Sequence, residues 1–311
     1  MSIDASLVLL HYNQSNCLRK TILALEQQKT DKTFEVIIAD DGSNFKNLLE
    51  VENIIKTSSL PIQLVWQQDL GFRAAKARNN GIMLSRSDLV ILADGDNIPN
   101  SDFIEKHILA HKNSDNTICT GSRIWKSEAE LNEQNVNIEQ IERNKFLETQ
   151  ENIQRNKSFH SINPWQAVYA FSLSFKKGQD TLFDEQFQGF GLEDWEFAYR
   201  LSKIHGYSIT FDPSIKTTQY DDFKRTQNPF KNLNQNDINL YIKNALYFIE
   251  KYPEDKCLHK DLIKFVSKFA YSQKNQKFER IYVDFDELAK KDVNDIIKNY
   301  ALLTKYKSKL K

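Results

Sequence analysis

The feature that most constrains the fold of this chain is a regular alternation of short apolar runs with helical patterns over its first 120 residues. Each run is rich in Val, Ile and Leu, as β-strands are, and each is followed by a stretch with helical spacing. The runs occupy residues 6–10, 34–39, 62–66 and 89–93, and the helical patterns occupy residues 16–27, 44–56, 73–85 and 101–112. Strands that alternate with helices form a mostly parallel sheet with helices on both faces. The sequence therefore predicts an α/β fold, and the uniformly apolar runs predict strands that are buried on both sides.

The residues that follow each run are unusually polar. They are residues 11–13, 40–43, 67–73 and 94–96. In sheets of this kind, ligands bind outside the carboxyl ends of the strands. The sequence therefore predicts that these four segments converge on one crevice.

Asp94-Gly95-Asp96 places two carboxylates on a tight turn directly after the fourth run. Carboxylate oxygens suit a Mg²⁺ or Mn²⁺ ion that bridges the phosphates of a nucleotide. Asp and Gly are also favoured in ordinary turns, so a purely structural turn is the alternative. The position after a buried strand of an α/β unit favours the ligand role.

Asp40-Asp41-Gly42-Ser43 occupies the same place after the second run. A carboxylate there can accept a hydrogen bond from a base N–H or a ribose hydroxyl, and the ring of Tyr12 could stack on a base. The alternative is a helix N-cap formed by Ser43 or Asn44.

Residues 70–82 combine small side chains, which allow close approach, with the cations Arg73, Lys76 and Arg78. A pyrophosphate at the start of a helix meets free N–H groups and positive charge together. A solvated basic helix is the alternative reading of this segment.

The segment Gly189–Glu196 presents adjacent carboxylates at a glycine-loosened helix start, flanked by aromatic residues. A carboxylate at such a point can act as a general base toward a sugar hydroxyl. Acidic residues in the first turn also stabilise a helix, which is the commoner role for any single one of them. Trp165 is a candidate platform for a sugar ring and equally a candidate core residue.

Composition excludes several classes of protein. Lys and Arg number 42 and Asp and Glu number 42, so the chain lacks the basic surplus of a nucleic-acid-binding protein. Cys17, Cys119 and Cys257 have neither disulfide-framework nor zinc spacing. His107 and His111 lie four residues apart without an HExxH motif, and we expect them to be structural.

The chain contains no apolar run near the roughly 20 residues of a membrane span, and its start lacks the basic region of a secretory signal. We therefore expect a cytoplasmic protein. The lysine-rich tail after residue 289 is expected to be a solvated helix end, with weak peripheral contact at the inner face of the membrane as the alternative.

Taken together, the motifs resemble those of inverting glycosyltransferases of family 2, which have the GT-A fold. The N-terminal half carries LLHYNQ, IIADDGS, GFRAAKARNNGI and ILADGDNIP in the family's order. The later segment FDEQFQGFGLEDWEFAYRL is similar to a motif of β-1,4-galactosyltransferases, polypeptide N-acetylgalactosaminyltransferases and bacterial chondroitin-type polymerases.

The resemblance implies a role for each matched residue on the donor side. Tyr12 and either Asp40 or Asp41 would hold uracil and ribose, and Arg73 and Arg78 would hold the diphosphate. Asp94 would contact the ribose and a Mn²⁺ or Mg²⁺ ion, and Asp96 would be the closer metal ligand.

On the acceptor side, Asp194 would be the catalytic base, and Glu193, Trp195 and Trp165 would bind the acceptor. The deprotonated hydroxyl would displace UDP from an α-linked UDP-sugar and leave a β-glycoside. Relatives usually carry a His after the last strand as a further metal ligand. Here Asp221 and Asp222 are the candidate substitutes.

The resemblance also implies how the chain is organised. A GT-A domain is predicted at residues 1–225, with a nucleotide-binding half at 1–120, a polar insertion at about 127–157 and an acceptor-binding half at 158–225. A helical C-terminal extension follows at residues 226–311.

The predicted function is transfer of a hexose or N-acetylhexosamine from a UDP-sugar to a glycan, glycolipid or peptide in bacterial surface glycan biosynthesis. One alternative is a sugar-phosphate nucleotidyltransferase, but residues 11–16 lack the glycine-rich loop that such enzymes carry after the first strand. The other is a non-catalytic sugar-nucleotide-binding protein, which binding without turnover would favour. No nucleic-acid partner is expected.

Overall fold

The computed structural model describes residues 3–127, 148, 152–161, 163–221, 235–266, 269–272 and 277–280. The chain divides into two compact units. The first unit consists of Met1–Glu185 and Glu193–Gln227, and the second of Gln186–Leu192 and Asn228–Lys311. The short segment 186–192 therefore belongs to the second unit, although the first unit continues on both sides of it in the sequence.

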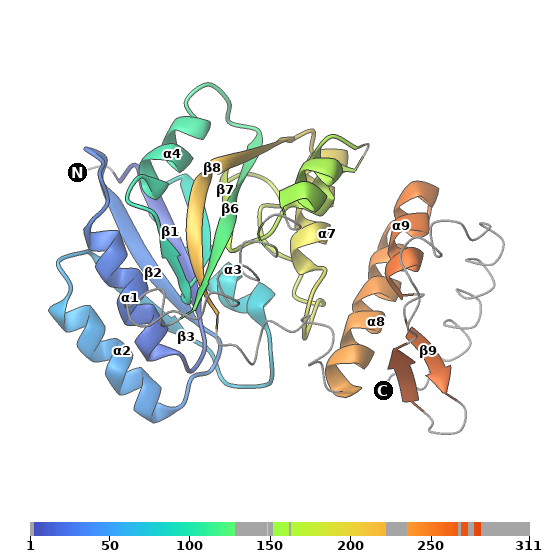
Figure 1. Cartoon of the computed structure of the whole chain (residues 1–311), viewed down its shortest axis with the longest axis horizontal. Coiled ribbons are helices and arrows are strands. Elements are labelled where there is room, and N and C mark those ends of the chain that lie inside the picture. The colour runs from blue at the N-terminus through green and yellow to red at the C-terminus, as the bar shows by residue number, and fades with distance from the viewer. Residues whose placement is uncertain are drawn as a thin grey trace. The chain divides into compact units, whose positions relative to one another are not determined.

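The first unit is built on a sheet that has eight strands among the described residues, in the order β3-β2-β1-β4-β7-β6-β8-β5 (Figure 1). The strands are β1 (Ala5–His11), β2 (Phe34–Asp40), β3 (Ile62–Trp66), β4 (Leu89–Asp94), β5 (Asn97–Pro99), β6 (Thr117–Ser127), β7 (Ser172–Lys176) and β8 (Ser208–Asp221). Strands β1 to β4 pair in parallel. Strand β7 runs antiparallel to its neighbours β4 and β6, and β5 runs antiparallel to β8. The predicted α/β fold is confirmed.

The helices of the first unit follow the predicted pattern. They are α1 (Ser15–Glu26), α2 (Phe45–Thr57), α3 (Ala74–Leu84), α4 (Phe103–Ala110) and α7 (Glu193–Tyr199), with a 3₁₀ turn at Pro164–Ala167 and a π-helical turn at Arg200–Ile204. The first four begin and end within two residues of the predicted bounds. The Asn44 side chain accepts a hydrogen bond from the Asn47 N–H, so Asn44 is the N-cap of α2.

The core lies around the central parallel strands. Leu7, Leu9, Val36, Ile38 and Ile91 are fully buried there. The prediction that every apolar run is buried on both sides is wrong for β3, whose side chains are exposed or half-buried. Strand β3 is an edge strand of the sheet and, among the described strands, pairs only with β2, so much of it stays open to solvent.

The second unit contains helices α8 (Gln235–Lys251) and α9 (Lys256–Val266) and the antiparallel strands β9 (Phe269–Ser272) and β10 (Lys277–Arg280). Helices were predicted for this part of the chain, but these two strands were not. Most of the predicted polar insertion and the lysine-rich tail lie outside the described residues. Among the helices that are described, none has both the length and the apolarity of a membrane span.

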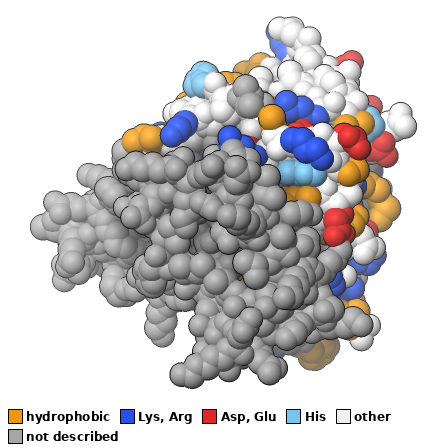
Figure 2. All heavy atoms as spheres, turned by 90° about the vertical axis from the view of Figure 1, so that its right-hand side faces the viewer, with side chains coloured by type: hydrophobic (Ala, Val, Ile, Leu, Met, Phe, Trp, Pro, Cys, Tyr) orange, Lys and Arg blue, Asp and Glu red, His pale blue; other side chains and the backbone are white. Residues whose placement is uncertain are grey.

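Figure 2 shows Lys and Arg side chains interspersed with Asp and Glu side chains on the described part of one face. This mixture matches the formal net charge of zero.

Candidate active site

The polar segments that follow β1, β2 and β4 meet at one edge of the sheet, as predicted. The backbone N–H of Asp41 donates to the carbonyl oxygen of His11 at 2.9 Å, and the N–H of Gly95 donates to that of Leu10 at 2.7 Å. These bonds continue the parallel pairing past the strand ends, so the turns that follow the three strands are fixed to one another.

Asp40 stabilises the turn after β2. Its Oδ1 accepts hydrogen bonds from the backbone N–H groups of Gly42 at 3.0 Å and Ser43 at 2.6 Å. Gly42 has a φ of 98°, and a Cβ there would lie 2.4 Å from Asp69 Cα. The turn therefore needs a glycine. In the structure, the Asp40 carboxylate binds the backbone of this turn. Its predicted contact with a nucleoside stays a prediction.

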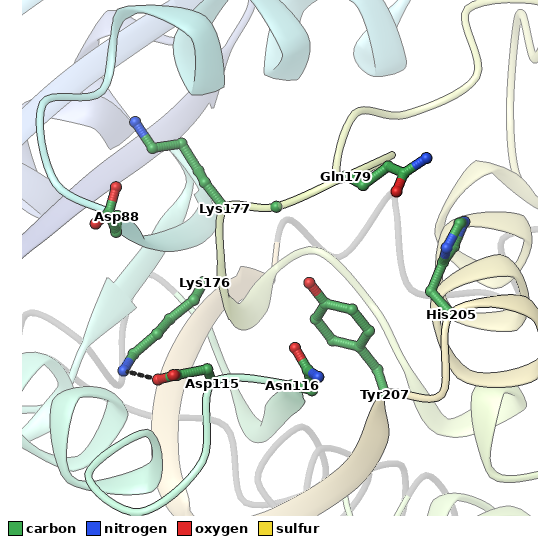
Figure 3. Close-up of a pocket in the computed structure, with 9 residues that line it drawn as sticks. Asp88, Asp115, Asn116, Lys176, Lys177, Gln179, His205 and Tyr207 are labelled. Carbon is green, nitrogen blue, oxygen red and sulfur yellow. Dashed lines mark hydrogen bonds and ion pairs between the residues drawn. The ribbon is translucent and has the colours of Figure 1, made fainter.

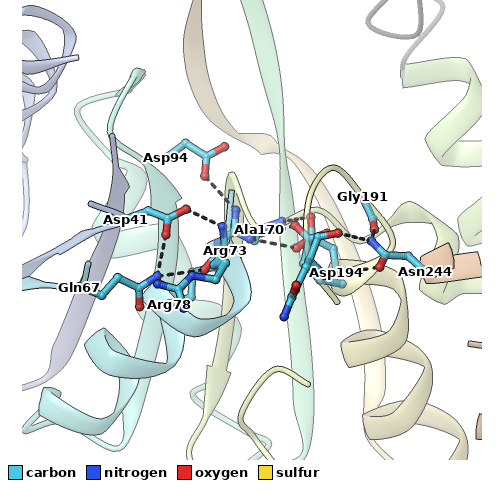
Figure 4. Close-up of polar contacts among 11 residues, drawn as sticks. Asp41, Gln67, Arg73, Arg78, Asp94, Ala170, Gly191, Asp194 and Asn244 are labelled. Atoms are coloured by element: carbon cyan, nitrogen blue, oxygen red, sulfur yellow. Dashed lines mark hydrogen bonds and ion pairs between the residues drawn. The ribbon is translucent and has the colours of Figure 1, made fainter. Parts of the chain in front are cut away.

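Asp41 joins the ends of β2, β3 and α3 (Figure 4). Its Oδ1 accepts from Gln67 Nε2 at 2.6 Å, and its Oδ2 accepts from the backbone N–H of Arg73 at 2.7 Å. Burial raises the pKa of Asp41, against the hydrogen bonds that lower it. The guanidinium of Arg73 donates to the carbonyl oxygen of Gln68 at 2.6 Å.

Exposed side chains also gather at this edge. The ring of Tyr12 is 45% exposed, and its hydroxyl donates to Asp69 Oδ2 at 3.1 Å. The side chains of Trp66 and Phe72 are also about half exposed. Asp69 was not among the predicted site residues, although it lies in the polar segment that follows β3.

Arg78 connects the two halves of the candidate site (Figure 4). Its NH2 lies 3.1 Å from Asp94 Oδ1. Its NH1 lies 3.2 Å from Glu193 Oε1 and 3.5 Å from Asp194 Oδ1. The structure thus brings Asp94, from the turn after β4, together with two carboxylates that lie about a hundred residues later in the sequence.

The guanidinium of Arg78 is surrounded by its three carboxylate partners. Burial alone would lower the pKa of this group, but the charges of Asp194, Asp94 and Glu193 outweigh burial and raise it. Arg78 therefore stays cationic. The family resemblance implied that this side chain contacts a diphosphate, whereas in the structure its N–H groups are directed at carboxylates of the protein.

Asp194 is a largely buried carboxyl group with a raised pKa. Its Oδ2 accepts a hydrogen bond from the backbone N–H of Ala170 at 3.0 Å. Burial and the neighbouring Glu193 raise the pKa of Asp194, Arg78 lowers it, and the balance is about 7. A general base works best when its pKa lies close to the working pH.

The structure places Trp165 in the core. It is fully buried, and its ring packs edge-on against Trp195 at 5.7 Å and Tyr199 at 5.6 Å between centroids. The expectation that Trp165 offers a face to an acceptor sugar is wrong, because its ring is covered by α7. Trp195 is only 7% exposed, so it too mainly packs within the protein.

The predicted metal ligands are only partly described. Asp94 and Asp96 are half-buried at the end of β4, whereas Asp222 and the side chain of Asp221 lie outside the described residues. Within the described part, no three His, Cys, Asp or Glu side chains are arranged to hold a metal ion. Asp94 and Asp96 would therefore fit a cation only together with further oxygens, such as those of a diphosphate.

A separate polar pocket of about 490 Å³ lies at the opposite edge of the sheet (Figure 3). Asp88 precedes β4, Lys176 ends β7 and Tyr207 precedes β8. Because Asp94 is the last residue of β4, the pocket lies at the other end of this strand from Asp94. The Nζ of Lys176 lies 2.5 Å from Asp115 Oδ1, and Lys177 Nζ donates to the carbonyl oxygen of Ser85. The pocket is therefore separate from the candidate active site, and its two lysines are already engaged.

The family model described as Glycosyl transferase family 2 matches residues 6–174. The hyaluronan synthase of Pasteurella multocida is 27% identical over an alignment of 240 residues that covers 68% of this chain and 24% of that protein. This chain therefore spans about a quarter of the length of that relative.

Two solved structures share the fold. The S. aureus TarS 1–349 structure in complex with UDP-GlcNAc has a TM-score of 0.56 at 14% identity and covers 86% of this chain and 72% of that chain. The mannosyltransferase PcManGT from Pyrobaculum calidifontis, in complex with GDP-Man and Mn²⁺, has a TM-score of 0.55 at 13% identity. It covers 100% of this chain and 84% of that chain.

Proposed function

Because this chain belongs to glycosyl transferase family 2 and has the GT-A fold, we propose that it transfers a hexose or N-acetylhexosamine from a UDP-sugar to an acceptor hydroxyl with inversion. The observation that carries this proposal is the Arg78 cluster. One guanidinium joins Asp94, at the strand end where a nucleotide is expected, to Glu193 and Asp194, where an acceptor is expected.

On the donor side, Tyr12 and Asp69 supply the exposed surface for uracil and ribose. An aromatic ring with an adjacent carboxylate can stack on a base and accept hydrogen bonds from a base N–H or ribose hydroxyl. The UDP-GlcNAc in the TarS structure supports a uridine nucleotide as the donor.

Asp94 and Asp96 would hold a divalent cation together with diphosphate oxygens. Such an ion, when bound, stabilises negative charge on the departing diphosphate. The Mn²⁺ in the mannosyltransferase structure supports this part of the proposal.

On the acceptor side, Asp194 acts as the base. Its carboxylate takes the proton of the acceptor hydroxyl, and the hydroxyl oxygen forms a bond to the anomeric carbon. The bond from that carbon to the diphosphate oxygen breaks, and its electron pair leaves with UDP. Because the nucleophile and the leaving group lie on opposite sides of the anomeric carbon, an α-linked donor yields a β-glycoside.

Arg78 contributes by keeping Asp194 ionised. Without a cation beside it, a buried carboxylate next to Glu193 would hold its proton more tightly and would be a poor base at neutral pH.

The acceptor is proposed to be a glycan, glycolipid or peptide precursor of a bacterial surface glycan, made in the cytoplasm with at most peripheral membrane contact. The similarity to a hyaluronan synthase supports a growing polysaccharide as the acceptor.

The test is hydrolysis of a panel of UDP-sugars with and without Mn²⁺, because water can replace an unknown acceptor. We expect at least one donor to be hydrolysed. Asp194→Asn should lower that rate by about 100-fold or more while UDP affinity, measured by calorimetry, changes little. Asp88→Asn, the same change at the opposite edge of the sheet, is the control. Equal loss of UDP affinity and turnover in Asp194→Asn would remove the base assignment.

A further inference from the structure

The segment that leads into the proposed base packs on helix α8. Residues 186–192 belong to the second unit and are followed directly by Glu193 and Asp194 at the start of α7. Three residues of this segment have left-handed backbone conformations: Gly189 with φ 72°, Gly191 with φ 89° and Leu192 with φ 78°. A residue with a Cβ, such as Leu192, adopts this conformation only when its surroundings hold it there.

Asn244 on α8 supplies much of this support. Its Nδ2 donates to the carbonyl oxygens of Gln188 and Gly191, both at 3.0 Å. Its Oδ1 accepts from the backbone N–H of Gln188 at 3.4 Å. An Asn side chain has two N–H donors and one carbonyl acceptor, so this residue binds both ends of the turn 188–191 at once. The Asn244 side chain is 3% exposed, so water cannot readily replace these bonds.

The two glycines of the same turn pack closely against α8. A Cβ at Gly189 would lie 2.6 Å from Leu240 Cδ1, and a Cβ at Gly191 would lie 3.1 Å from the Tyr241 ring. The Phe187 ring meets the Phe248 ring at 5.9 Å between centroids. The backbone of this segment therefore lies directly against α8, with no room for larger side chains at the two glycines.

We infer that helix α8 holds the segment 186–192, and that Asn244 is a positioning residue for Asp194, because it fixes the turn 188–191 from which the chain runs through Leu192 and Glu193 to Asp194. This inference rests on the proposed function for its catalytic consequence. Asn244 touches neither donor nor acceptor in this account. It acts through the backbone of the segment, whose left-handed residues Gly189, Gly191 and Leu192 lead directly to Glu193.

The decisive variants are Asn244→Asp and Asn244→Leu, which keep the size of the side chain and remove its N–H donors. We expect UDP affinity to stay within about twofold, because Tyr12, Asp69 and the turns that hold them belong to the first unit. We expect kcat for UDP-sugar hydrolysis to fall at least tenfold, and the pH at which the rate is half-maximal to move, because Asp194 shifts relative to Arg78. Asn53→Asp, the same change on the exposed face of α2, is the matched control.

A second measurement does not depend on activity. Native-state cleavage by chymotrypsin after Phe187 or Phe190 should accelerate in both Asn244 variants and not in Asn53→Asp. Gly189→Ala, which drives a Cβ into Leu240, should accelerate it as well.

Unchanged kcat and unchanged cleavage in the Asn244 variants would overturn the inference. Equal loss of UDP affinity and kcat would also overturn it, because that result indicates general unfolding. If the wild type hydrolyses no UDP-sugar, the proposed function fails by that result alone. The cleavage rates then still decide whether Asn244 holds the segment.

Discussion

Two buried histidines should make the first unit sensitive to mild acid. His107 Nδ1 and His111 Nε2 each lie 2.8 Å from Ser174 Oγ, and His107 Nε2 lies 3.3 Å from Ser172 Oγ. Burial, together with the nearby His111, lowers the pKa of His107 to about 3. Burial lowers the pKa of His111 to about 4, with Lys176 acting in the same direction.

The sign of the effect follows from comparing folded and unfolded chains. Unfolded histidine has a pKa near 6.5, so below that pH the unfolded chain takes up protons that the folded chain cannot. Stability is therefore complete above about pH 6.5 and is lost as the pH falls toward the folded-state values. At pH 5 each histidine should cost about 2 kcal/mol, because each pKa unit corresponds to about 1.4 kcal/mol. The pair should remove about 4 kcal/mol, a large part of the stability of about 5–15 kcal/mol of a typical domain.

Urea unfolding at pH 7.5 and pH 5.0, followed by tryptophan fluorescence, measures this loss. The signal reports on the first unit, since all four tryptophans belong to it: Trp66, Trp125, Trp165 and Trp195. The difference in unfolding free energy between the two pH values should be about 4 kcal/mol smaller in a His107→Asn/His111→Asn variant than in the wild type. In the single variant His111→Asn, this difference should be smaller than in the wild type by about half as much. His160→Gln, at an exposed histidine, should change nothing. The same pH dependence in the wild type and the double variant would refute the reasoning.

Two further predictions concern the candidate site. Arg78→Met should lower the unfolding free energy by about 3–5 kcal/mol, because it leaves three largely buried carboxylates without their cation. It should also raise the pKa of Asp194 and shift the pH profile of hydrolysis to higher pH. Arg78→Lys keeps a cation, so both shifts should be smaller. An unchanged urea midpoint for Arg78→Met would contradict the assigned contacts. Tyr12→Ala should weaken UDP and free uridine alike in calorimetry. Tyr12→Phe, which loses only the hydrogen bond to Asp69, should cost less than about tenfold. An effect of Tyr12→Ala on neither ligand would place the base elsewhere.

The parallel half of the fold was predictable because its signals are local. Each apolar run is followed by a helical pattern, and β1, β2, β4 and their helices formed where the spacing indicated. The antiparallel half was not. Strands β5 and β6 contain no long apolar run, and β7 enters the sheet between β4 and β6 through pairing that no local pattern encodes.

The candidate site was predictable as a set of residues but not as a set of contacts. The sequence indicated Asp94, Arg78 and Asp194, and the structure brings them together. The family resemblance implied that Arg78 contacts a diphosphate. Its carboxylate partner Glu193 lies 115 positions away, so no spacing rule could indicate that contact. The histidine pair shows the same limit, since its serine partners are on β7, more than 60 residues later.

The position of Asn244 within α8 carries a signal that is visible in the sequence. Tyr241, Ala245 and Phe248 are apolar residues at helical spacing, and Asn244 lies three residues after the first of these and four before the last. Residues at these spacings share a helix face, so an Asn there is buried with these apolar residues. A buried amide must find hydrogen-bond partners, and an apolar face offers none of its own. Such a residue therefore predicts a backbone segment docked on that face, and Gly189 and Gly191 mark a segment whose backbone can come close enough to be that partner.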